Sequence, residues 1–500
     1  MMPPAEHPVI ARARAHADRV AIVDAEGAWT YAHLLHRSSM LAAALLDGRN
    51  EVAGGRVLLL ASAGIDFAAA LWAVWRSGGI AVPLSPGQTP AEWAQIADDA
   101  RPEAAVVSPE FAARFADVER GRQVRVVSPF AAGRLPAHDP DPDPDRAALM
   151  LYTSGTTSRP KGVVLTHGNL RAQIECLVEA WAWTDADRIP LVLPLNHVHG
   201  LVNILSCALW SGATCEMFRA FDPAQVWERI ASGGATVFMA VPTVYFRLIA
   251  AWQAAPGDVQ EAWSAGARRL RLMVSGSAAL PVRVLECWRD ITGHTLLERY
   301  GMTETGMILS NPLSGERRPG SVGVPLPGVE VRLLDEHGAG IAEGEPGELH
   351  VRSASVFREY WGRPEQTSAA FRDGGWFRTG DVAVVERSMY RLLGRLSVDI
   401  IKTGGEKVSA LEIEEVIREH PTVADCAVVG VPDPEWGERV SAAVVLNPGA
   451  ALALGELQAW ARARLGGPRL PRRLLVVEAL PRNALGKVAK PAVARLFETG

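Results

Sequence analysis

Apolar runs that suit strands alternate with segments of helical periodicity through most of the chain. Residues 30–46 place apolar side chains at helical spacing, and residues 56–62 (RVLLLAS) form a short apolar run typical of a buried strand. The same pair of patterns returns at 66–84, where a helix is expected to end at Gly78 and Gly79. Further strand-like runs begin at residues 104, 188, 235 and 269. Such alternation predicts an α/β fold whose sheets are largely parallel.

A second, smaller unit is expected to begin near Arg395. An amphipathic helix is predicted after Val408, and the runs that follow it describe a unit of domain size with its own core. A chain of 500 residues exceeds what one hydrophobic core usually supports, so at least two domains are expected. We predict a large N-terminal domain, residues 1–394, with parallel-rich sheets and helices, and a small α+β C-terminal domain, residues 395–500.

Composition and charge narrow the classes of function. Hydrophobic residues make up 48% and charged residues 21%, as in a globular rather than a disordered protein. No run of 18 apolar residues occurs and the net charge is −5, so neither a membrane nor a nucleic acid is expected as a partner. The five cysteines are scattered without metal-binding spacing, and the N-terminus has no apolar signal core. We expect reduced thiols in a cytoplasmic protein.

The loop TSGTTSRPKG at 153–162 has the composition of a phosphate-binding segment. It fails the Walker A pattern, because no glycine directly precedes its lysine. What remains is a turn whose hydroxyls, glycine amide and lysine could hold the outer phosphates of ATP. These groups belong to Thr153, Ser154, Gly155, Thr156, Thr157 and Lys161. Taken alone, the loop fits a polar surface turn equally well.

Three further motifs carry groups suited to a nucleotide. Residues 298–305 (ERYGMTET) supply an aromatic ring, hydroxyls and Glu304, whose carboxylate is a suitable oxygen ligand for Mg²⁺. Residues 376–381 (WFRTGD) end in Asp381, which can accept hydrogen bonds from both ribose hydroxyls, and residues 481–487 (PRNALGK) present Lys487. An isolated charged side chain is usually a solvated surface group, so each motif is weak by itself.

In this order and spacing the motifs resemble the adenylate-forming superfamily of acyl-CoA synthetases, nonribosomal-peptide adenylation domains and beetle luciferases. The likeness runs from residue 153 to residue 487 and includes DRVAIVDAEGAWTYAHL at 18–34. It implies a mobile C-terminal domain that rotates about a hinge near Ser397. It also implies two half-reactions, in which a carboxylate attacks ATP to give an acyl-AMP and pyrophosphate, and a thiol then displaces AMP.

The resemblance assigns roles to residues in the adenylation step. Lys487 would stabilise the charge that develops as the carboxylate attacks the α phosphorus, and Glu304 would hold Mg²⁺. Thr303, Lys161 and His197 complete the residues expected to act in catalysis. The expected ATP contacts are the phosphate loop, Ser277, Ala278, Tyr300, Gly301, Met302, Thr303, Asp381, Arg395 and Lys487.

The second half-reaction would use the segment IKTGGEK at 401–407. The resemblance places Lys402, Gly404 and Gly405 at CoA, where close approach of the pantetheine arm would leave no room for a Cβ atom. Two places depart from the family's usual pattern. Ser158 replaces a common glycine and is followed by Arg159, and Ser397 stands where many relatives have Asp or Lys. We expect altered loop mobility from the first departure rather than lost activity.

Arg299, directly before the expected adenine-stacking tyrosine, is the main indication of which acid is used. An arginine inside a pocket is costly unless an anion accompanies it. An internal ion pair with Glu298 or another acid would meet this need. A substrate with a second carboxylate would meet it as well, because the guanidinium fork suits bidentate carboxylate binding.

Several segments, including RLMVSGSAAL at 271–280 and VFREYW at 356–361, resemble malonyl-CoA synthetases. By that likeness the distal carboxylate would be held by Arg247, Arg299, Ser277 and one of His197 and His199, and Met307 would limit the C2 substituent. We predict an ATP- and Mg²⁺-dependent malonate–CoA ligase (AMP-forming) that uses CoA as co-substrate, with methylmalonate as a second acid.

Two alternatives stay open. One is a short- or medium-chain monocarboxylate–CoA ligase, in which Arg299 is satisfied internally. The other is an adenylation enzyme that loads a carrier protein, which is less favoured as a partner than free CoA. A non-catalytic nucleotide-binding relative is least favoured, because Lys161, Glu304, Asp381 and Lys487 are all present.

Overall fold

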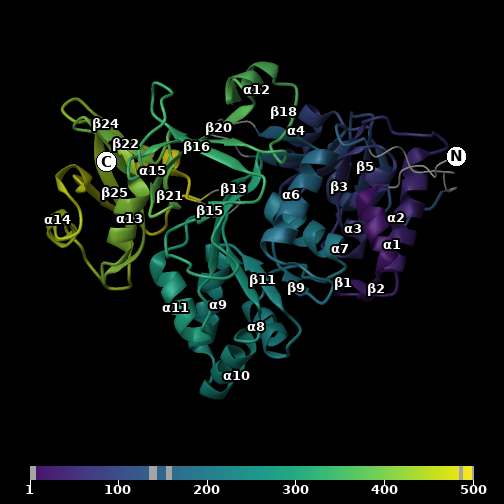
Figure 1. The fold of residues 1–500 in the computed structure, drawn as a ribbon, viewed down its shortest axis with the longest axis horizontal. Helices are drawn as coiled ribbons and strands as arrows, with labels where there is room; N and C mark the ends of the chain where they lie inside the picture. The colour runs from purple at the N-terminus through teal and green to yellow at the C-terminus, as the bar shows by residue number, and fades with distance from the viewer. Residues whose placement is uncertain (1–6, 134–142, 154–159, 483–487, 498–500) are drawn as a thin grey trace. The chain divides into compact units, whose positions relative to one another are not determined.

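The structure is a computed structural model that describes residues 7–133, 143–153, 160–482 and 488–497. The described chain forms two compact units. The first comprises Met1–Arg318, Pro325–Glu330 and Arg352–Phe371, and the second comprises Pro319–Val324, Val331–Val351 and Arg372–Gly500. Both units combine helices and sheets, so the predicted α/β class with a large N-terminal and a smaller C-terminal part is confirmed (Figure 1).

A seven-stranded sheet organises the first half of the first unit. Its strand order is β18-β8-β7-β4-β3-β5-β6, and the neighbours from β7 to β6 are parallel, whereas β8 is antiparallel to both β7 and β18. The strands are β3 (Arg56–Leu60), β4 (Ile80–Pro83), β5 (Ala104–Val107), β6 (Arg125–Val127), β7 (Ala147–Thr153), β8 (Lys161–Thr166) and β18 (Glu359–Tyr360). Strands β3, β4 and β5 are almost entirely buried, as their apolar runs predict.

Two further sheets complete the first unit. One has the order β2-β1-β10-β9, and the other begins β11-β12-β13-β14. Their bounds are β1 (Val20–Asp24), β2 (Gly27–Thr30), β9 (Arg188–Leu191), β10 (Thr214–Met217), β11 (Val237–Ala240), β12 (Leu272–Ser275), β13 (Leu297–Met302) and β14 (Gly306–Ser310). Strands β11, β12 and β13 are parallel, and β14 returns antiparallel to β13. The segments after β12 and β13 therefore leave the sheet at one edge, where the candidate site residues 275–279 and 303–304 lie.

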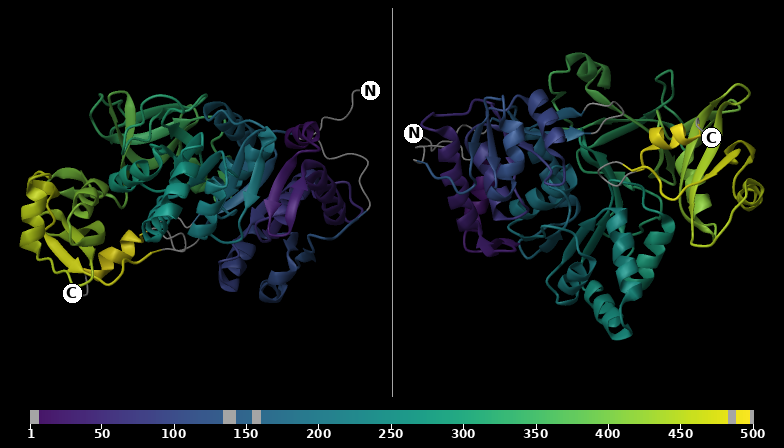
Figure 2. Two further views of the ribbon diagram at one scale, coloured as in Figure 1. Left: turned by 90° about the horizontal axis from the view of Figure 1, so that it is seen from below. Right: turned by 180° about the vertical axis from the view of Figure 1, so that it is seen from behind.

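Some helices of the first unit start at a residue whose side chain caps them. Thr30 and Thr166 accept a hydrogen bond from the third residue of α2 and α6, whose side chain returns a bond to the cap. The bounds are α1 (Pro8–Ala15), α2 (Tyr31–Leu46), α3 (Ile65–Arg76), α4 (Pro90–Ala100), α5 (Pro109–Glu119), α6 (His167–Ala180), α7 (Cys207–Ser211), α8 (Pro223–Ala231), α9 (Pro242–Ala254), α10 (Gly257–Ala267), α11 (Val282–Thr292) and α12 (Pro364–Ala370). Helices α2 and α3 pack side by side (Figures 1 and 2).

The second unit contains two sheets. The first pairs β16 (Glu330–Leu334), β17 (Gly347–Arg352), β20 (Trp376–Glu386) and β21 (Met389–Arg395), and the second pairs β22 (Ile400–Thr403), β23 (Glu406–Ser409), β24 (Val423–Asp433), β25 (Gly437–Leu446) and β26 (Arg473–Val476). The helices are α13 (Ala410–Arg418), α14 (Leu454–Arg462) and α15 (Lys490–Leu496). Short strands β15 (Val324–Pro325) and β19 (Phe371–Arg372) fall where the chain passes between the units.

The two-unit division differs in detail from the boundary expected near Arg395. Chain contacts group β20 and β21, which precede that boundary, with the C-terminal residues. The C-terminal sheet nevertheless has its own buried core, which includes Ile413, Val428 and Val440. A domain boundary at 394/395 and a hinge near Ser397 stay predictions.

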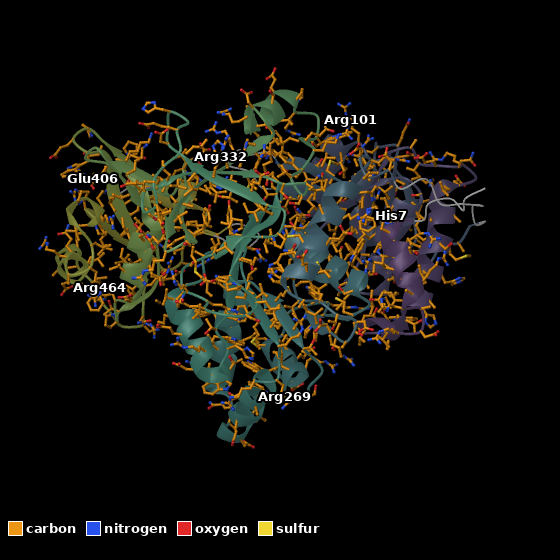
Figure 3. All side chains as sticks on the ribbon, in the orientation of Figure 1. His7, Arg101, Arg269, Arg332, Glu406 and Arg464 are labelled. Atoms are coloured by element: carbon orange, nitrogen blue, oxygen red, sulfur yellow. The ribbon has the colours of Figure 1, made fainter. Side chains whose placement is uncertain are left out.

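Charge and burial follow the expected pattern. Charged side chains such as Arg101, Arg269, Glu406 and Arg464 are exposed (Figure 3). None of the helices in the described part of the chain has the length and hydrophobicity needed to span a bilayer.

Candidate active site

The strands that flank the phosphate loop are neighbours in the seven-stranded sheet. Thr153 ends β7 and Lys161 begins β8, and the two residues are paired across the ladder. Ser154, Gly155, Thr156, Thr157, Ser158 and Arg159 lie outside the described residues, as does Lys487. The structure therefore places the two ends of the loop, and the contacts expected of the residues between them stay predictions.

Glu304 lies in the turn between β13 and β14 and contacts the same tyrosine as the lysine of the phosphate loop. Its carboxylate is buried, and Oε1 accepts a hydrogen bond of 2.9 Å from the Tyr360 hydroxyl. The Lys161 ammonium lies over the same tyrosine ring, 5.4 Å from its centroid. Two residues that separate sequence motifs indicated thus contact one side chain, Tyr360, for which the sequence indicated no role at the nucleotide.

Glu304 suits the role of a magnesium ligand beside ATP. Mg²⁺ in nucleotide sites usually takes one or two protein carboxylates and completes its shell with phosphates and waters. Within the described ranges no group of three or more His, Cys, Asp or Glu side chains forms a cage for a metal. A single buried carboxylate, oriented by a hydrogen bond from Tyr360, fits the first arrangement, so the residues present are compatible with the ion.

Arg299 sits inside the first unit, and none of the described carboxylates pairs with it. It lies on β13, is only 2% exposed, and its Nη1 atom is 3.4 Å from Ser277 Oγ. Its Nε and Nη2 atoms have no hydrogen-bond partner among the described residues. Burial lowers the pKa of Arg299 to about 9. Arg299 is therefore a buried cation with two guanidinium nitrogens that a bound anion could accept hydrogen bonds from.

The alternative of an internal ion pair with Glu298 or another acid is not observed among the described residues. Neighbouring residues of a strand point to opposite faces of the sheet, so Arg299 and Glu298 diverge. Gly276, after β12, lets the guanidinium approach the backbone closely, because a Cβ atom there would lie 2.7 Å from Arg299 Cζ. Arg299 is therefore held from β12 and β13 and is not neutralised there by an acidic residue among the described residues.

Ser277 and His199 extend the same cluster. The Ser277 hydroxyl lies 3.2 Å from His199 Nδ1, and Ser277 has a left-handed backbone, with φ of 69°. Burial, with Arg299 and His197 nearby, holds the pKa of His199 well below its usual value, so the imidazole is neutral. A π-helix, His199–Ser206, starts at this histidine, and such helices occur frequently at functional sites. The sequence had placed these three residues together only through a family likeness.

Two other residues expected at the acid differ in their surroundings. Arg247 is exposed on α9, with its guanidinium over the Phe221 ring at 4.7 Å. No described contact joins it to Arg299, and its role as a carboxylate ligand stays a prediction. Met307 is buried on β14, where a Cβ atom added at Gly301 would lie 2.7 Å from the Met307 methyl carbon. Met307 thus packs beside the segment expected at the nucleotide.

The remaining residues that were predicted to contact the nucleotide in the first unit are partly or fully exposed. Tyr300, Gly301, Met302 and Thr303 are half-buried, and Ala278 is exposed. His197 is also half-buried, two residues before the π-helix. Their positions at the ends of β12 and β13 are consistent with ligand contact, and their individual roles stay predictions.

In the second unit, Asp381 and Arg395 form a pair. They are opposite each other on β20 and β21, and Arg395 Nε lies 2.9 Å from Asp381 Oδ1. Arg395 Nη1 also donates to the Thr379 carbonyl oxygen at 2.8 Å. The Asp381 side chain is largely buried, so the two expected ribose-binding residues are held in fixed orientation.

Gly404 and Gly405 form the turn between β22 and β23. Their φ angles are 57° and 84°, the left-handed values that a two-residue hairpin turn requires. A Cβ atom on Gly404 would also meet the Trp436 ring at 3.2 Å. The turn itself explains both glycines, so the expected contact of Lys402, Gly404 and Gly405 with CoA stays a prediction.

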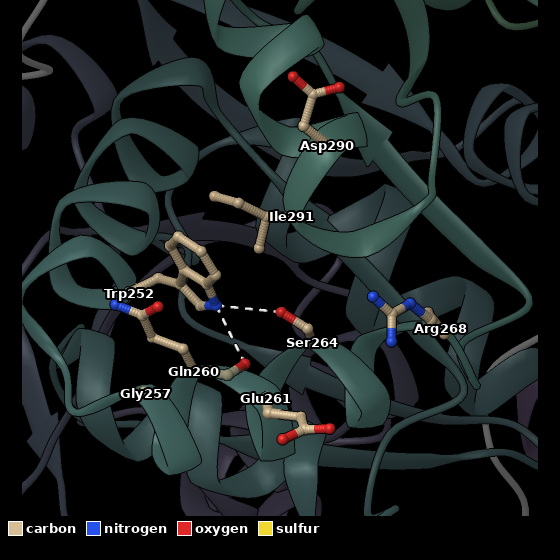
Figure 4. A pocket seen from close by; sticks show the side chains of 8 residues that line it. All are labelled: Trp252, Gly257, Gln260, Glu261, Ser264, Arg268, Asp290 and Ile291. Atoms are coloured by element: carbon tan, nitrogen blue, oxygen red, sulfur yellow. Dashed lines mark hydrogen bonds between the residues drawn. The ribbon is translucent and has the colours of Figure 1, made fainter.

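A separate surface pocket of about 330 Å³ lies among α9, α10 and α11 (Figure 4). Trp252 donates from its indole nitrogen to Ser264 Oγ and to the Gln260 carbonyl oxygen, and the side chains of Arg268 and Asp290 stand at its edge. None of the residues identified from the sequence lines this pocket.

Comparison with known proteins covers nearly the whole chain. Residues 9–361 match the model of the AMP-binding enzyme family, and residues 412–487 match that of the AMP-binding enzyme C-terminal domain. The mouse mitochondrial malonate–CoA ligase ACSF3 is 47% identical, with 99% of this chain and 91% of the relative covered.

Solved structures agree with this assignment. ATP-bound MatB from Rhodopseudomonas palustris has a TM-score of 0.89 and 34% identity, with 99% of each chain covered. A malonyl-CoA ligase with methylmalonyl-CoA and AMP bound has a TM-score of 0.70 and 38% identity, covering 95% of this chain and 100% of that one. The chain therefore belongs to the AMP-binding enzyme family.

Proposed function

We propose that the protein is a malonate–CoA ligase (AMP-forming), which converts ATP, malonate and CoA to malonyl-CoA, AMP and pyrophosphate. The observation that carries this proposal is the buried Arg299, whose Nε and Nη2 atoms have no partner among the described residues. It is supported by relatives named malonate–CoA ligase at up to 47% identity and by the structure of a malonyl-CoA ligase.

Arg299 would select the acid. A dicarboxylate can place one carboxylate on the guanidinium and leave the other for reaction, whereas a monocarboxylate would leave a desolvated cation uncompensated. Ser277 and the neutral His199 add hydrogen-bonding groups on one side of the guanidinium without adding charge. Because the Arg299 guanidinium packs closely against Gly276, this contact would help to define where the distal carboxylate binds.

The free carboxylate oxygen would attack the α phosphorus of ATP, and pyrophosphate would leave. Lys161 would hold the outer phosphates, and Lys487 would stabilise the charge that develops at the reacting centre. Glu304 would hold Mg²⁺, which neutralises phosphate charge when bound. Asp381, fixed by Arg395, would hold the ribose.

In the second half-reaction the CoA thiol would attack the carbonyl carbon of malonyl-AMP. The thiol loses its proton, the new carbon–sulfur bond forms, and AMP leaves as the phosphate anion. Lys402 and the hairpin turn at Gly404 and Gly405 would lie along the pantetheine arm. Methylmalonate would be a second substrate if the space beside Met307 admits a methyl group at C2.

The proposal is tested by measuring pyrophosphate release from ATP with a panel of C2 to C8 mono- and dicarboxylates, with and without CoA. We expect malonate to give the highest rate and malonyl-CoA to form in the presence of CoA. Monocarboxylates that react faster than malonate would overturn the choice of acid. Pyrophosphate release without acylation of free CoA would instead indicate a carrier protein as the acceptor.

A further inference from the structure

The segment that contains Tyr360 contacts two parts of the candidate site in the first unit. On one side, Tyr360 donates to Glu304 Oε1 at 2.9 Å and Phe357 donates from its backbone to the Glu304 carbonyl oxygen at 2.7 Å. Ser355 adds a hydrogen bond of 2.8 Å to the Thr305 carbonyl oxygen. The turn that carries Glu304 is thus held through both its backbone and its carboxylate.

On the other side, the same segment holds β8, the strand that begins with the phosphate-loop lysine. Strand β18 pairs antiparallel with β8, with Tyr360 opposite Val163. Trp361 donates from its backbone to the Gly162 carbonyl oxygen at 2.8 Å. The Lys161 ammonium lies 5.4 Å from the centroid of the Tyr360 ring. Glu304 and Lys161 therefore share one tyrosine, which contacts the first through its hydroxyl and the second through its ring face.

We propose that Tyr360 is a positioning residue for the magnesium-bound nucleotide: its hydroxyl orients the Glu304 carboxylate and its ring supports the Lys161 ammonium. This inference rests on the proposed function. A carboxylate that turns freely loses rotamer entropy when it binds a cation, and one already held by a hydrogen bond loses less. The ring face attracts the ammonium and so supports it on the side of the tyrosine away from the hydroxyl's bond to Glu304.

The chain offers a matched control for the tyrosine hydroxyl. Tyr152 stands on β7 next to the other end of the phosphate loop, and its hydroxyl donates to Asp99 Oδ2 at 2.7 Å. This bond has the same chemistry and nearly the same length as the bond from Tyr360 to Glu304, but Asp99 is paired with Arg363 rather than placed at the nucleotide. The Tyr152→Phe variant thus reports the loss of a tyrosine–carboxylate bond that does not involve Glu304.

The experiment measures the affinity of the full chain for a non-hydrolysable ATP analogue by isothermal titration calorimetry, with Mg²⁺ and with EDTA. Tyr360→Phe keeps the ring and removes the hydroxyl. We expect it to weaken binding about fivefold to tenfold with Mg²⁺ and to leave binding in EDTA unchanged, since a hydrogen bond to a charged group is lost. Tyr152→Phe should match the wild type in both conditions.

A second readout is the Mg²⁺ dependence of malonate-dependent exchange between pyrophosphate and ATP. Tyr360→Phe should need several times more Mg²⁺ for half-maximal exchange, with the KM for malonate unchanged. Equal Mg²⁺-dependent binding in Tyr360→Phe and the wild type, or equal weakening in both tyrosine variants, would overturn the inference. Absence of analogue binding by the wild type would instead contradict the proposed function, so the two failures can be distinguished.

Discussion

Replacing Arg299 by methionine should stabilise the unliganded protein while removing its use of malonate. The guanidinium is 2% exposed, and its only hydrogen bond among the described residues is the long one of 3.4 Å to Ser277. Methionine fills a similar volume without a charge. A protein that keeps a buried cation for its substrate gives up stability in the unliganded state.

The size of the effect follows from the pKa of Arg299. Burial lowers it from its ordinary value of 12.5 to about 9, and one unit corresponds to about 1.4 kcal/mol, so the folded protein disfavours the charge by about 5 kcal/mol. Because the pKa is lowered on folding, this penalty is complete below pH 9 and is released as the pH rises from about 9 toward 12.5. Imperfect packing of methionine offsets part of the gain, and we expect a net stabilisation of about 1–4 kcal/mol at pH 7.5.

The assay is unfolding in urea at pH 7.5, followed by tryptophan fluorescence, for the wild type, Arg299→Met and Arg271→Met. Arg271 is the control, because it forms hydrogen bonds of 2.7 and 2.6 Å to the buried Asp187. Its replacement leaves that carboxylate unpaired and should destabilise the first unit by about 3–5 kcal/mol. If Arg299→Met is destabilised in the same way, Arg299 is satisfied by the protein itself, and the reasoning that assigns it to a substrate carboxylate is refuted.

Three further perturbations test other parts of the structure. Gly276→Ala places a Cβ atom 2.7 Å from Arg299 Cζ. We expect the KM for malonate to rise about tenfold, with little change in the KM for ATP. Equal changes in both KM values would argue against a local effect. Lys490→Met removes a cation that lies 2.6 Å from Asp399 and 2.7 Å from Glu414. In urea unfolding, the free energy of unfolding of the second unit should fall by about 3–5 kcal/mol. A loss under about 1 kcal/mol would contradict this. Burial lowers the pKa of His167 to about 4, so between pH 6.5 and 4 the unfolded chain takes up a proton that the folded chain does not, and stability falls. The free energy of unfolding of His167→Gln should therefore fall less over this pH range than that of the wild type. Parallel curves of unfolding free energy against pH would refute this.

Local patterns in the sequence were sufficient to predict several of the buried strands. The apolar runs of β3, β4 and β5 require burial on both faces, which is observed. Glu304 was identifiable because a carboxylate is a suitable Mg²⁺ ligand and stands in a motif whose order and spacing resemble a known family. The glycine pair at 404–405 was identifiable too, although a hairpin turn explains it without reference to a ligand.

Other features depend on contacts between residues far apart in the chain. Tyr360 is 56 residues from Glu304, and only the pairing of β18 with β8 brings its ring to Lys161. The absence of an ion pair between Arg299 and Glu298 could have been foreseen, because adjacent strand residues face opposite sides. The exposure of Arg247 was likewise visible in the helical pattern, since Tyr245 and Leu248 form the buried face of α9.

The boundary between the two units was the feature least accessible from the sequence. Strands β20 and β21 have ordinary strand patterns, and their grouping with the C-terminal residues depends on sheet pairing rather than on any break in composition. Each unit is made of three separate chain segments, so the chain passes between the units several times. A single linker rich in proline or glycine therefore does not mark the boundary in the sequence.

The central claim, that Arg299 selects a dicarboxylic acid, is tested most directly by comparing kcat/KM for malonate with that for isovalerate, in which an isopropyl group replaces the distal carboxylate. For the wild type we expect malonate to be preferred at least about 10³-fold, because a buried charged group left unpaired rejects the apolar analogue. In Arg299→Ala this preference should fall to near one or reverse. Malonate turnover that survives the substitution unchanged would contradict the account.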